Sequence, residues 1–502
     1  MRPVWGASPD RSLLGVIFVI ALLVRAPWLV AIDGPGYLDA AYSDLIGREL
    51  AAGHGLSEPI IWHWLRLPEA IVHPSHDYWM PLEAVLVAGS VRLLGERWPA
   101  PVLPNLVLSA ALAPVAAWLA GRWGASRREA AVAAGLALVA GPYAAHWTTT
   151  DPMAVAALVG SLALICADRP GWRWAFLGGS LAGLGQLARA EGFLLLATIL
   201  IVRSARREWR AAALAAAAYG LVVAPWAARN LAEFGVATPA GLATIWLTEY
   251  NDLFRPGGAS TAEWMARGLG AIATEKMLAL GLNLGVLALL GHLFLTPFAL
   301  GGLLVLRRRQ PAPLVYLALL LVAMSLVFTF PGARGGFAHG LAALVPAFAA
   351  ATVLGLQRFS GWLASRRRLD PSEARQRIAL IALSGSLAAG LGLGWQQLGE
   401  WRTWRADLGL AAAEIRAQDP GAVVMVADPA TYAVLSGTSA IVMPNLPPSD
   451  AVALARRYQT RFVLVGDAYP RAWSAWLTED EAVPGVREVG SAGQFRLFEI
   501  LP

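Results

Sequence analysis

Residues 13–32 read LLGVIFVIALLVRAPWLVAI, and this stretch decides the fold class. It carries a single charged side chain, Arg25, in a run long enough to cross a bilayer, because a transmembrane helix needs about 20 mostly apolar residues. A cleaved signal peptide is shorter and ends at a small-residue cleavage site, which this run lacks. The stretch therefore predicts a first transmembrane helix.

Similar apolar runs recur along most of the chain. The residue types AVILMFWYC make up 57% of the 502 residues, and only 15% are charged, against about 25% in soluble globular proteins. We expect a mainly α-helical, polytopic transmembrane protein with about 11 to 13 spans, in which the shorter segments are tilted or broken helices. The apolar segments are 12–32, 80–95, 101–120, 129–146, 152–167, 174–187, 192–203, 211–227, 278–304, 311–330, 340–358 and 377–397.

The formal charge is +6, and the basic residues are mostly arginines in short clusters between the apolar segments. The positive-inside rule places such clusters in the cytoplasm, so the charge does not indicate nucleic-acid binding. With the clusters at 203–210, 307–309 and 358–377 in the cytoplasm, the outward segments are 33–79, 228–277, 331–339 and everything after 397. Counting forward from a cytoplasmic N-terminus disagrees by one crossing between residues 80 and 128, so one segment there is miscounted or re-entrant.

From about residue 398 the pattern changes. VVMV at 423–426 and FVLV at 462–465 are short β-prone runs, helical spacing lies between them at 449–458, and 495–500 alternates like a terminal strand. We predict a transmembrane domain at 1–397, with a large first outer loop at 33–79, and a small extracytoplasmic α/β domain at 398–502. The single cysteine, Cys166, excludes a disulfide framework or a cysteine-based zinc site within the chain.

Polar residues concentrate in the first outer loop, which begins with Asp33-Gly-Pro-Gly-Tyr37-Leu-Asp39 at the end of the first span. We expect a carboxylate at the membrane surface to be partly desolvated, which raises its basicity and suits a general base acting on a hydroxyl. Asp33 is therefore a candidate catalytic residue. The alternative is an aspartate that only caps a helix.

Further along the same loop, His73, His76 and Asp77 lie within five positions. Imidazole and carboxylate groups at this spacing could ligate a divalent metal. The alternative is a solvated entry to the next helix, so the sequence leaves the presence of a metal unknown.

A second group of polar residues lies at the outward ends of later spans. Ionisable groups at membrane depth are costly, and are functional candidates for that reason. Outward arginines are disfavoured by the positive-inside rule, and a guanidinium suits a phosphate. For the arginines the alternative is a snorkelling or paired side chain, and for Asp151 it is a helix cap. The candidates for substrate binding in this group are Asp151, Arg189, Glu191, Arg229, Arg334 and His339.

Several motifs occur in the order found in a known family. Arg25-Ala-Pro-Trp leads to Asp33 with Tyr37 four residues later, which is similar to Asp-Glu-x-x-Tyr, and Tyr78-Trp-Met-Pro-Leu is similar to Pro-Pro-Leu. Over about residues 12–350 the chain resembles the GT-C superfamily of membrane glycosyltransferases, which includes protein O-mannosyltransferases, the lipid A aminoarabinose transferase and Rgt-like members. The other matching motifs are Thr150-Asp-Pro, Leu187-Ala-Arg-Ala-Glu-Gly, Pro225-Trp and Arg229-Asn.

The resemblance implies an enzyme in the cell membrane that moves a sugar from a polyprenyl-phosphate carrier to an acceptor hydroxyl on the outer face, with inversion. It implies that Asp33 is the base. The family's Glu after this Asp is Gly34 here, so Asp39 or Asp77 would supply the second carboxylate. The implied partners are the lipid-linked donor, a lipid, glycan or protein acceptor, and membrane lipids. A divalent metal is possible, and no nucleotide-sugar site or nucleic acid is expected.

Two other functions remain open. A secondary transporter or lipid flippase would explain the many spans and buried charges, but transporters usually contain two related halves, and no duplication is visible. A catalytically inactive GT-C relative would explain Gly34. In a transferase the first-loop carboxylates and the outward arginines should converge on one cavity, whereas a transporter should place its charges near mid-membrane.

Overall fold

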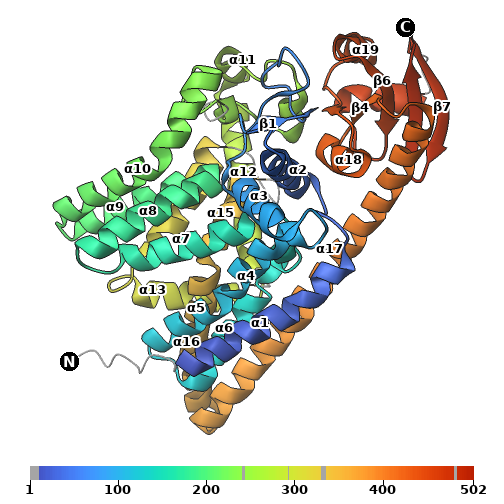
Figure 1. Cartoon of the computed structure of the whole chain (residues 1–502). Coiled ribbons are helices and arrows are strands. Elements are labelled where there is room, and N and C mark those ends of the chain that lie inside the picture. The colour runs from blue at the N-terminus through green and yellow to red at the C-terminus, as the bar shows by residue number, and fades with distance from the viewer. Residues whose placement is uncertain (1–10, 240–242, 292, 329–334, 480–482, 502) are drawn as a thin grey trace.

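A computed structural model describes residues 11–239, 243–291, 293–328, 335–479 and 483–501. It is a helical bundle with a small sheet at one end (Figure 1), which confirms the predicted polytopic helical protein with a C-terminal α/β part. Six stretches within these ranges are long and apolar enough to cross a membrane. They are α1 (Arg11–Ala31), η1–α5 (Ala100–Arg122), α10 (Trp209–Phe234), α12 (Gly268–Leu290), α15–α16 (Gly336–Arg367) and α17 (Pro371–Gln418).

Shorter helices complete the bundle, as the short apolar segments predict. Lipid is as apolar as the side chains, so helices in a membrane associate through close packing at small residues. At the crossing of α13 and α16, a side chain at Gly302 would meet the backbone of Ala351, and one at Gly355 would meet the backbone of Phe298. The shorter helices are α6 (Arg127–Leu138), α7 (Met153–Ala167), α8 (Trp172–Ala188), α9 (Phe193–Ala205), α13 (Thr296–Leu306) and α14 (Ala312–Val322), which continues as η7 (Ala323–Val327).

Helix α3 (Leu82–Leu94) lies in the stretch where the forward and backward counts of crossings disagree. Its 13 residues are about 20 Å long, which is short of the ~30 Å hydrocarbon core. It packs against α2 (Leu38–Ala52), next to the C-terminal sheet domain (Figure 1). If α3 does not cross, the forward and backward counts agree.

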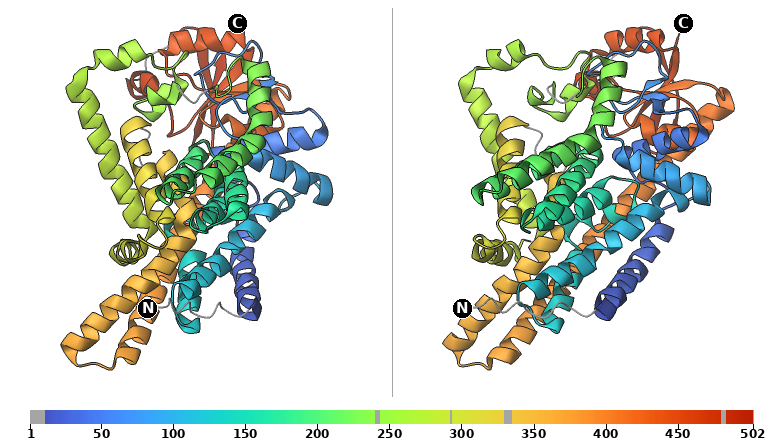
Figure 2. Two further views of the ribbon diagram at one scale, coloured as in Figure 1. Left: turned by 90° about the vertical axis from the view of Figure 1, so that its left-hand side faces the viewer. Right: turned by 60° about the vertical axis from the view of Figure 1, so that its left-hand side comes forward.

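Helix α17 joins the membrane bundle to the sheet. Its 48 residues extend about 70 Å, far more than one membrane crossing needs. The hairpin of α16 and α17 lies at the end of the molecule opposite the sheet (Figure 2). Helix α17 passes the predicted domain boundary at 397/398 without a break and ends at Gln418, so one helix belongs to both predicted domains.

The C-terminal sheet contains six strands in the order β2-β5-β4-β6-β8-β7. The first four strands are parallel to one another. Strand β8 is antiparallel to both of its neighbours, β6 and β7. The predicted strands at 423–426, 462–465 and 495–500 lie in β4, β6 and β8, and the predicted helix at 449–458 matches α19. The elements are β4 (Val423–Val426), α18 (Pro429–Ser436), β5 (Ala440–Val442), α19 (Pro448–Arg457), β6 (Thr460–Val465), α20 (Ser474–Glu479), β7 (Val486–Ala492) and β8 (Phe495–Ile500).

Strand β2 (Ile60–Ile61) comes from the first outer loop, yet it pairs with β5 in the C-terminal sheet. The indole of Trp64 also donates a hydrogen bond to the carbonyl of Val442, at 3.1 Å. Trp62 and Trp64 share one apolar core with residues of the sheet. The first loop and the C-terminal domain therefore lie on the same side of the membrane, which we call the domain side.

Candidate functional site

Three polar side chains from distant parts of the chain meet beside the start of α2. Asp39 lies in the first turn of α2, Asp151 comes just before α7, and His339 belongs to α15 (Gly336–Leu341). One carboxylate oxygen or ring nitrogen of each lies within 4.8 Å of the others. Asp151 and His339 are buried and Asp39 is half-buried. We call these three residues the carboxylate–histidine cluster.

Asp151 is held through both oxygens of its carboxylate. Oδ1 accepts the backbone N–H of Met153, the first residue of α7, at 2.8 Å. Oδ2 accepts the hydroxyl of Tyr37 at 2.6 Å. Asp151 therefore contacts the first residue of α7, although Pro152 occupies the cap position of this helix, and the same side chain also belongs to the cluster.

Asn105 fixes the backbone around Asp151, and the sequence analysis missed it. Its side-chain amide donates to the carbonyls of Thr149 and Asp151, at 2.8 and 2.9 Å, and to the carboxylate of Glu83 at 2.7 Å. Both Asn105 and Glu83 are buried. The available signal was an amide and a carboxylate within otherwise apolar segments, where polar groups need partners.

Arg189 connects the cluster to the end of α8. Its Nε donates to Glu191 at 3.1 Å, and its Nη2 lies 2.7 Å from Nδ1 of His339. A guanidinium cannot accept a hydrogen bond, so Nδ1 of His339 accepts and a neutral ring carries its proton on Nε2. Arg189, Glu191 and His339, predicted separately from the sequence, thus lie together beside Asp39 and Asp151.

The cluster has the donor types that bind a divalent cation, namely two carboxylates and an imidazole. Its present hydrogen bonds compete with that role, because Asp151 already accepts from Tyr37 and from the α7 backbone. The Nδ1 lone pair of His339 is used by Arg189. A cation would therefore have to displace Tyr37 or Arg189 from these atoms.

Asp33 does not have the environment that the sequence suggested. Its side chain is 93% exposed, so the expectation of a partly desolvated carboxylate is wrong. Its Oδ1 lies 3.5 Å from Nε of Arg405, a buried side chain of α17. A side chain at Gly34 would overlap the guanidinium of Arg405. The space for a Glu at this position is thus filled by an arginine from a distant helix, which the local motif could not reveal.

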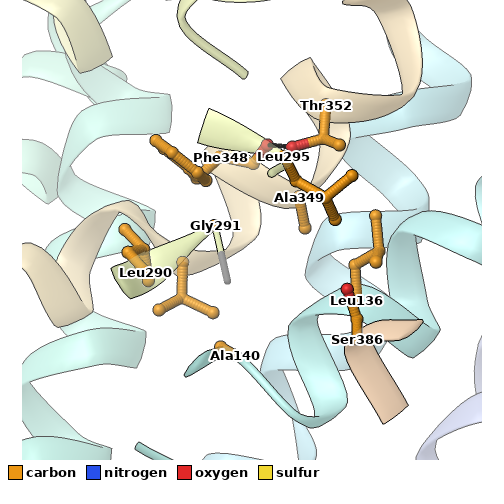
Figure 3. Close-up of a pocket in the computed structure, with 10 residues that line it drawn as sticks. Leu136, Ala140, Leu290, Gly291, Leu295, Phe348, Ala349, Thr352 and Ser386 are labelled. Atoms are coloured by element: carbon orange, nitrogen blue, oxygen red, sulfur yellow. Dashed lines mark hydrogen bonds between the residues drawn. The ribbon is translucent and has the colours of Figure 1, made fainter. Parts of the chain in front are cut away.

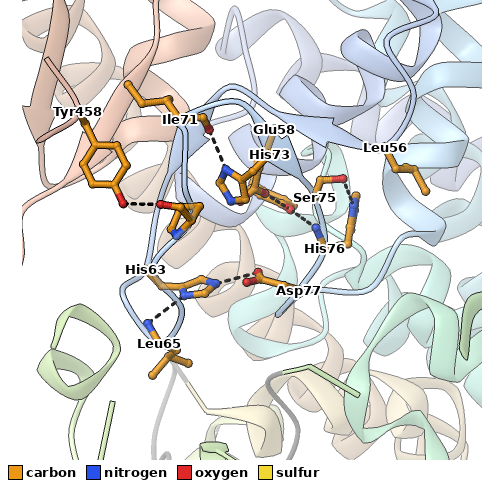
Figure 4. Close-up of polar contacts among 12 residues, drawn as sticks. Leu56, Glu58, His63, Leu65, Ile71, His73, Ser75, His76, Asp77 and Tyr458 are labelled. Carbon is orange, nitrogen blue, oxygen red and sulfur yellow. Dashed lines mark hydrogen bonds and ion pairs between the residues drawn. The ribbon is translucent and has the colours of Figure 1, made fainter. Parts of the chain in front are cut away.

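The other predicted residues of the first loop form a separate polar network (Figure 4). Strands β1 (Ser57–Glu58) and β3 (His73–Pro74) form a short antiparallel pair, which brings His73 to 2.8 Å from Glu58. Asp77 accepts from Nε2 of His63 at 2.9 Å, and the ring of His76 contacts Ser75 at 2.8 Å. His73, His76 and Asp77 thus have different partners and do not converge as one metal site.

Burial and pairing set the protonation of this network. Burial alone would lower the pKa of His73, but its hydrogen bond to Glu58 and the charge of that carboxylate raise the pKa overall. Burial, together with the charge of Arg229, lowers the pKa of His76 to about 3, so this ring is neutral. Burial alone would raise the pKa of Asp77, but His63 outweighs it and the pKa is lowered. The partners thus favour the charged forms of His73 and Asp77, whereas burial favours the neutral form of His76.

Arg229 lies apart from Arg189. It lines an open cleft of ≈ 510 Å³ between the domain-side end of α10 and the β1–β3 pair. The only other predicted arginine, Arg334, is outside the described residues. The arginines that the sequence grouped together therefore belong to at least two different sites.

A smaller cavity lies within the membrane bundle, among α6, α16 and α17 (Figure 3). Its volume is ≈ 20 Å³, and its lining is mostly apolar, with the hydroxyls of Thr352 and Ser386 at its edge. Thr352 donates to the carbonyl of Phe348 within its own helix. This cavity has room for about one water molecule and none for a sugar.

No protein-family model matches the sequence, and the search of curated proteins finds no match. Solved structures do match. ArnT from Cupriavidus metallidurans bound to undecaprenyl phosphate has a TM-score of 0.63 at 14% identity, over 98% of this chain and 99% of that chain. The apo form of ArnT has a TM-score of 0.61 at 14% identity, over 97% and 98%.

The oligosaccharyltransferase of Archaeoglobus fulgidus in its apo form is also similar, with a TM-score of 0.55 at 14% identity. The match covers 91% of this chain and 69% of that chain. Both proteins are GT-C glycosyltransferases. The chain therefore has the GT-C fold along nearly its whole length, including the C-terminal sheet that ArnT matches as well.

Proposed function

We propose that the chain is a membrane glycosyltransferase that moves a sugar from a polyprenyl-phosphate carrier to an acceptor hydroxyl on the outer face, with inversion. The observation that carries the proposal is the convergence of a first-loop carboxylate, Asp39, with an outward arginine, Arg189, around Asp151 and His339. The likeness to ArnT, a protein solved with undecaprenyl phosphate, supports a lipid-linked donor.

The residues of the cluster and Arg189 come from the ends of four helical segments. Asp39 and Asp151 stand at the starts of α2 and α7, Arg189 ends α8, and His339 lies in the short helix that begins the α15–α16 span. All four thus lie at helix ends. They bring carboxylate, guanidinium and imidazole groups to one place, as the proposed transfer requires.

The chemistry needs a base and a phosphate-binding group. In our proposal Asp39 takes the proton from the acceptor hydroxyl. At the same time the oxygen of that hydroxyl forms the new bond to the anomeric carbon of the sugar. The bond from that carbon to the phosphate oxygen breaks, and polyprenyl phosphate leaves with the electron pair. Arg189 has N–H donors beyond those used by Glu191 and His339, and these stabilise the leaving phosphate.

Three carboxylates of the first loop are candidates for the base. Asp33 matches the family motif, but its side chain is 93% exposed and its nearest charged neighbour is Arg405, at 3.5 Å. Asp39 lies in the cluster with Asp151, His339 and Arg189. The geometry therefore favours Asp39, and we propose it as the base ahead of Asp33 and Asp77.

A divalent cation is a second possibility for the cluster, supported by its three donor side chains within 4.8 Å. When bound, it would act as a Lewis acid on the phosphate oxygens. Transfer activity that is lost with EDTA and restored by Mn²⁺ or Mg²⁺ would support this role. Activity unchanged by EDTA would exclude it.

The direct test is a transfer assay with purified protein, radiolabelled polyprenyl-phosphate sugars and membrane acceptors. We expect transfer by the wild type, and a loss of about 10²–10⁴-fold in turnover for Asp39→Asn, which keeps the shape of the side chain but removes its basicity. Donor affinity should change little, because the donor phosphate is itself an anion.

Asp33→Asn and Asp77→Asn are the matched controls, since each removes one first-loop carboxylate. Full turnover in Asp39→Asn together with a large loss in Asp33→Asn would identify Asp33, the residue of the family motif, as the base. An absence of transfer with every donor, alongside intact donor binding, would favour the inactive relative.

A further inference from the structure

The open cleft at the end of α10 has a volume of ≈ 510 Å³, and the proposed transfer step does not use it. Its walls are the end of α2, the β1–β3 pair and the last two turns of α10. Only 17% of the apolar window of α10 is buried inside the protein, and the window is apolar enough to cross a membrane. The cleft lies at the end of this helix.

Arg229 is held in the cleft with its charge uncompensated by a direct ion pair. The guanidinium lies over the rings of Trp226 and Phe234, at 5.0 and 4.9 Å from their centroids. It donates to the carbonyl of Leu56 and the side chain of Asn230, both at 3.2 Å. Neutral acceptors thus hold the side chain in place, and further N–H donors of its planar fork remain for an anion.

Glu233 follows Arg229 by one helical turn and also lines the cleft. An Arg–Glu pair at this spacing commonly forms an ion pair. Among the described residues neither side chain has an oppositely charged partner within 4.0 Å, because the aromatic rings and Leu56 draw Arg229 aside. The cleft therefore presents one cation and one anion side by side, which matches a ligand with a phosphate and an amine.

The cleft and the carboxylate–histidine cluster are linked through α2. His73 lines the cleft, and its partner Glu58 also accepts the hydroxyl of Tyr42, at 2.5 Å. Tyr42 is one helical turn from Asp39. A ligand held in the cleft thus lies next to the helix that carries the proposed base.

We infer that this cleft binds the zwitterionic headgroup of a membrane phospholipid, with its phosphate at Arg229 and its ammonium group at Glu233. That this lipid is the sugar acceptor rests on the proposed function, since only a transferase needs an acceptor. The binding itself does not depend on it. The site is separate from the donor phosphate, which we assign to Arg189.

The test counts lipids bound to the purified full-length protein by native mass spectrometry. The probes are phosphatidylethanolamine, phosphatidylglycerol, diacylglycerol, polyprenyl phosphate and inorganic phosphate. The variants are Arg229→Gln, Arg229→Lys and Glu233→Gln, with Arg471→Gln as the control because that arginine is exposed and already paired with Glu249. Arg229→Lys keeps the charge but loses the fork.

We expect phosphatidylethanolamine to bind the wild type, and its affinity to fall about tenfold or more in Arg229→Gln, less in Arg229→Lys and not at all in the control. Glu233→Gln should weaken binding of phosphatidylethanolamine but not of phosphatidylglycerol. Polyprenyl phosphate should still bind Arg229→Gln. Diacylglycerol has no phosphate, so its affinity should be the same for the wild type and for every variant.

Three results would overturn the inference. The first is equal phosphatidylethanolamine binding by the wild type and both Arg229 variants. The second is loss of polyprenyl phosphate binding in Arg229→Gln, which would make the cleft part of the donor site. The third is inorganic phosphate binding as tightly as the lipid. If the lipid binds as expected but no sugar is transferred to any acceptor, the proposed function and the acceptor role of the lipid are both wrong. The inferred lipid-binding site is then still correct.

Discussion

At the scale of single residues, Asn105 shows how one amide can organise a site. Its side chain holds Glu83 and the backbone on both sides of Thr150, so it determines where Asp151 stands. It touches none of the reacting groups, and we regard it as a positioning residue.

Asn105→Ala should therefore lower turnover by about tenfold or more, since small displacements of catalytic groups are costly. The control is Asn283→Ala. Asn283 is also buried, and it donates to Ser325 and to the carbonyl of Met324 in another part of the bundle. Both variants should lose about 1–3 kcal/mol of stability. Equal turnover in the two variants would show that Asn105 is structural only.

The His73–Glu58 pair predicts a pH dependence of stability. Because the folded protein raises the pKa of His73, the stabilisation is complete below the unfolded value of about 6.5 and is lost as pH rises through the folded value. The thermal midpoint in detergent should fall as pH is raised above neutrality. His73→Gln should reduce this fall. His54→Gln, at an exposed histidine, should leave it unchanged, and an identical fall in all three proteins would contradict the assignment.

At the scale of elements, the contact of Gly34 with Arg405 ties the start of the first loop to α17. Arg405 also lies near Asp44 on α2 and Asp428 at the start of α18, and its charge opposes the rise that burial causes in the pKa of each carboxyl group. One guanidinium thus faces carboxylates from three other parts of the chain.

Gly34→Ala should cost about 1–3 kcal/mol of stability, because the new methyl group forces the guanidinium away from these carboxylates. The same substitution should cost less in an Arg405→Ala background. Gly89→Ala is the control, since a side chain there meets nothing within 4 Å. Additive effects of the Gly34 and Arg405 substitutions, measured as thermal midpoints, would count against the coupling.

At the scale of the whole molecule, the shared sheet requires the first loop and the C-terminal domain to face the same side, opposite Arg307–Arg309 if the arginine pattern holds. In a Cys166→Ser background, a cysteine at 450 should react with an impermeant reagent from the outside. A cysteine at 310 should react only after the membrane is permeabilised. Labelling of both from one side would make the topology wrong.

Local patterns predicted the helical bundle, the short strands near the C-terminus and most of the polar residues that cluster. The spacing of apolar residues and the positions of arginines can be read from short stretches of sequence. For this reason α1 and β6 could be predicted directly. The role of Arg405 could not, because it depends on a contact between α17 and Gly34 across most of the chain. Nor could the separation of Arg189 from Arg229, since both arginines end outward helices and only packing distinguishes them.

The pairing of β2 with β5 has a consequence for biosynthesis. Trp64 and its partner Val442 are 378 residues apart, so at ~5–20 residues per second the ribosome needs roughly 20–75 seconds to make the second after the first. During that interval the translocated loop carries unpaired backbone and apolar tryptophans without their partner. Messages truncated before codon 440 should therefore yield chains that insert but are recognised and degraded by quality-control proteases.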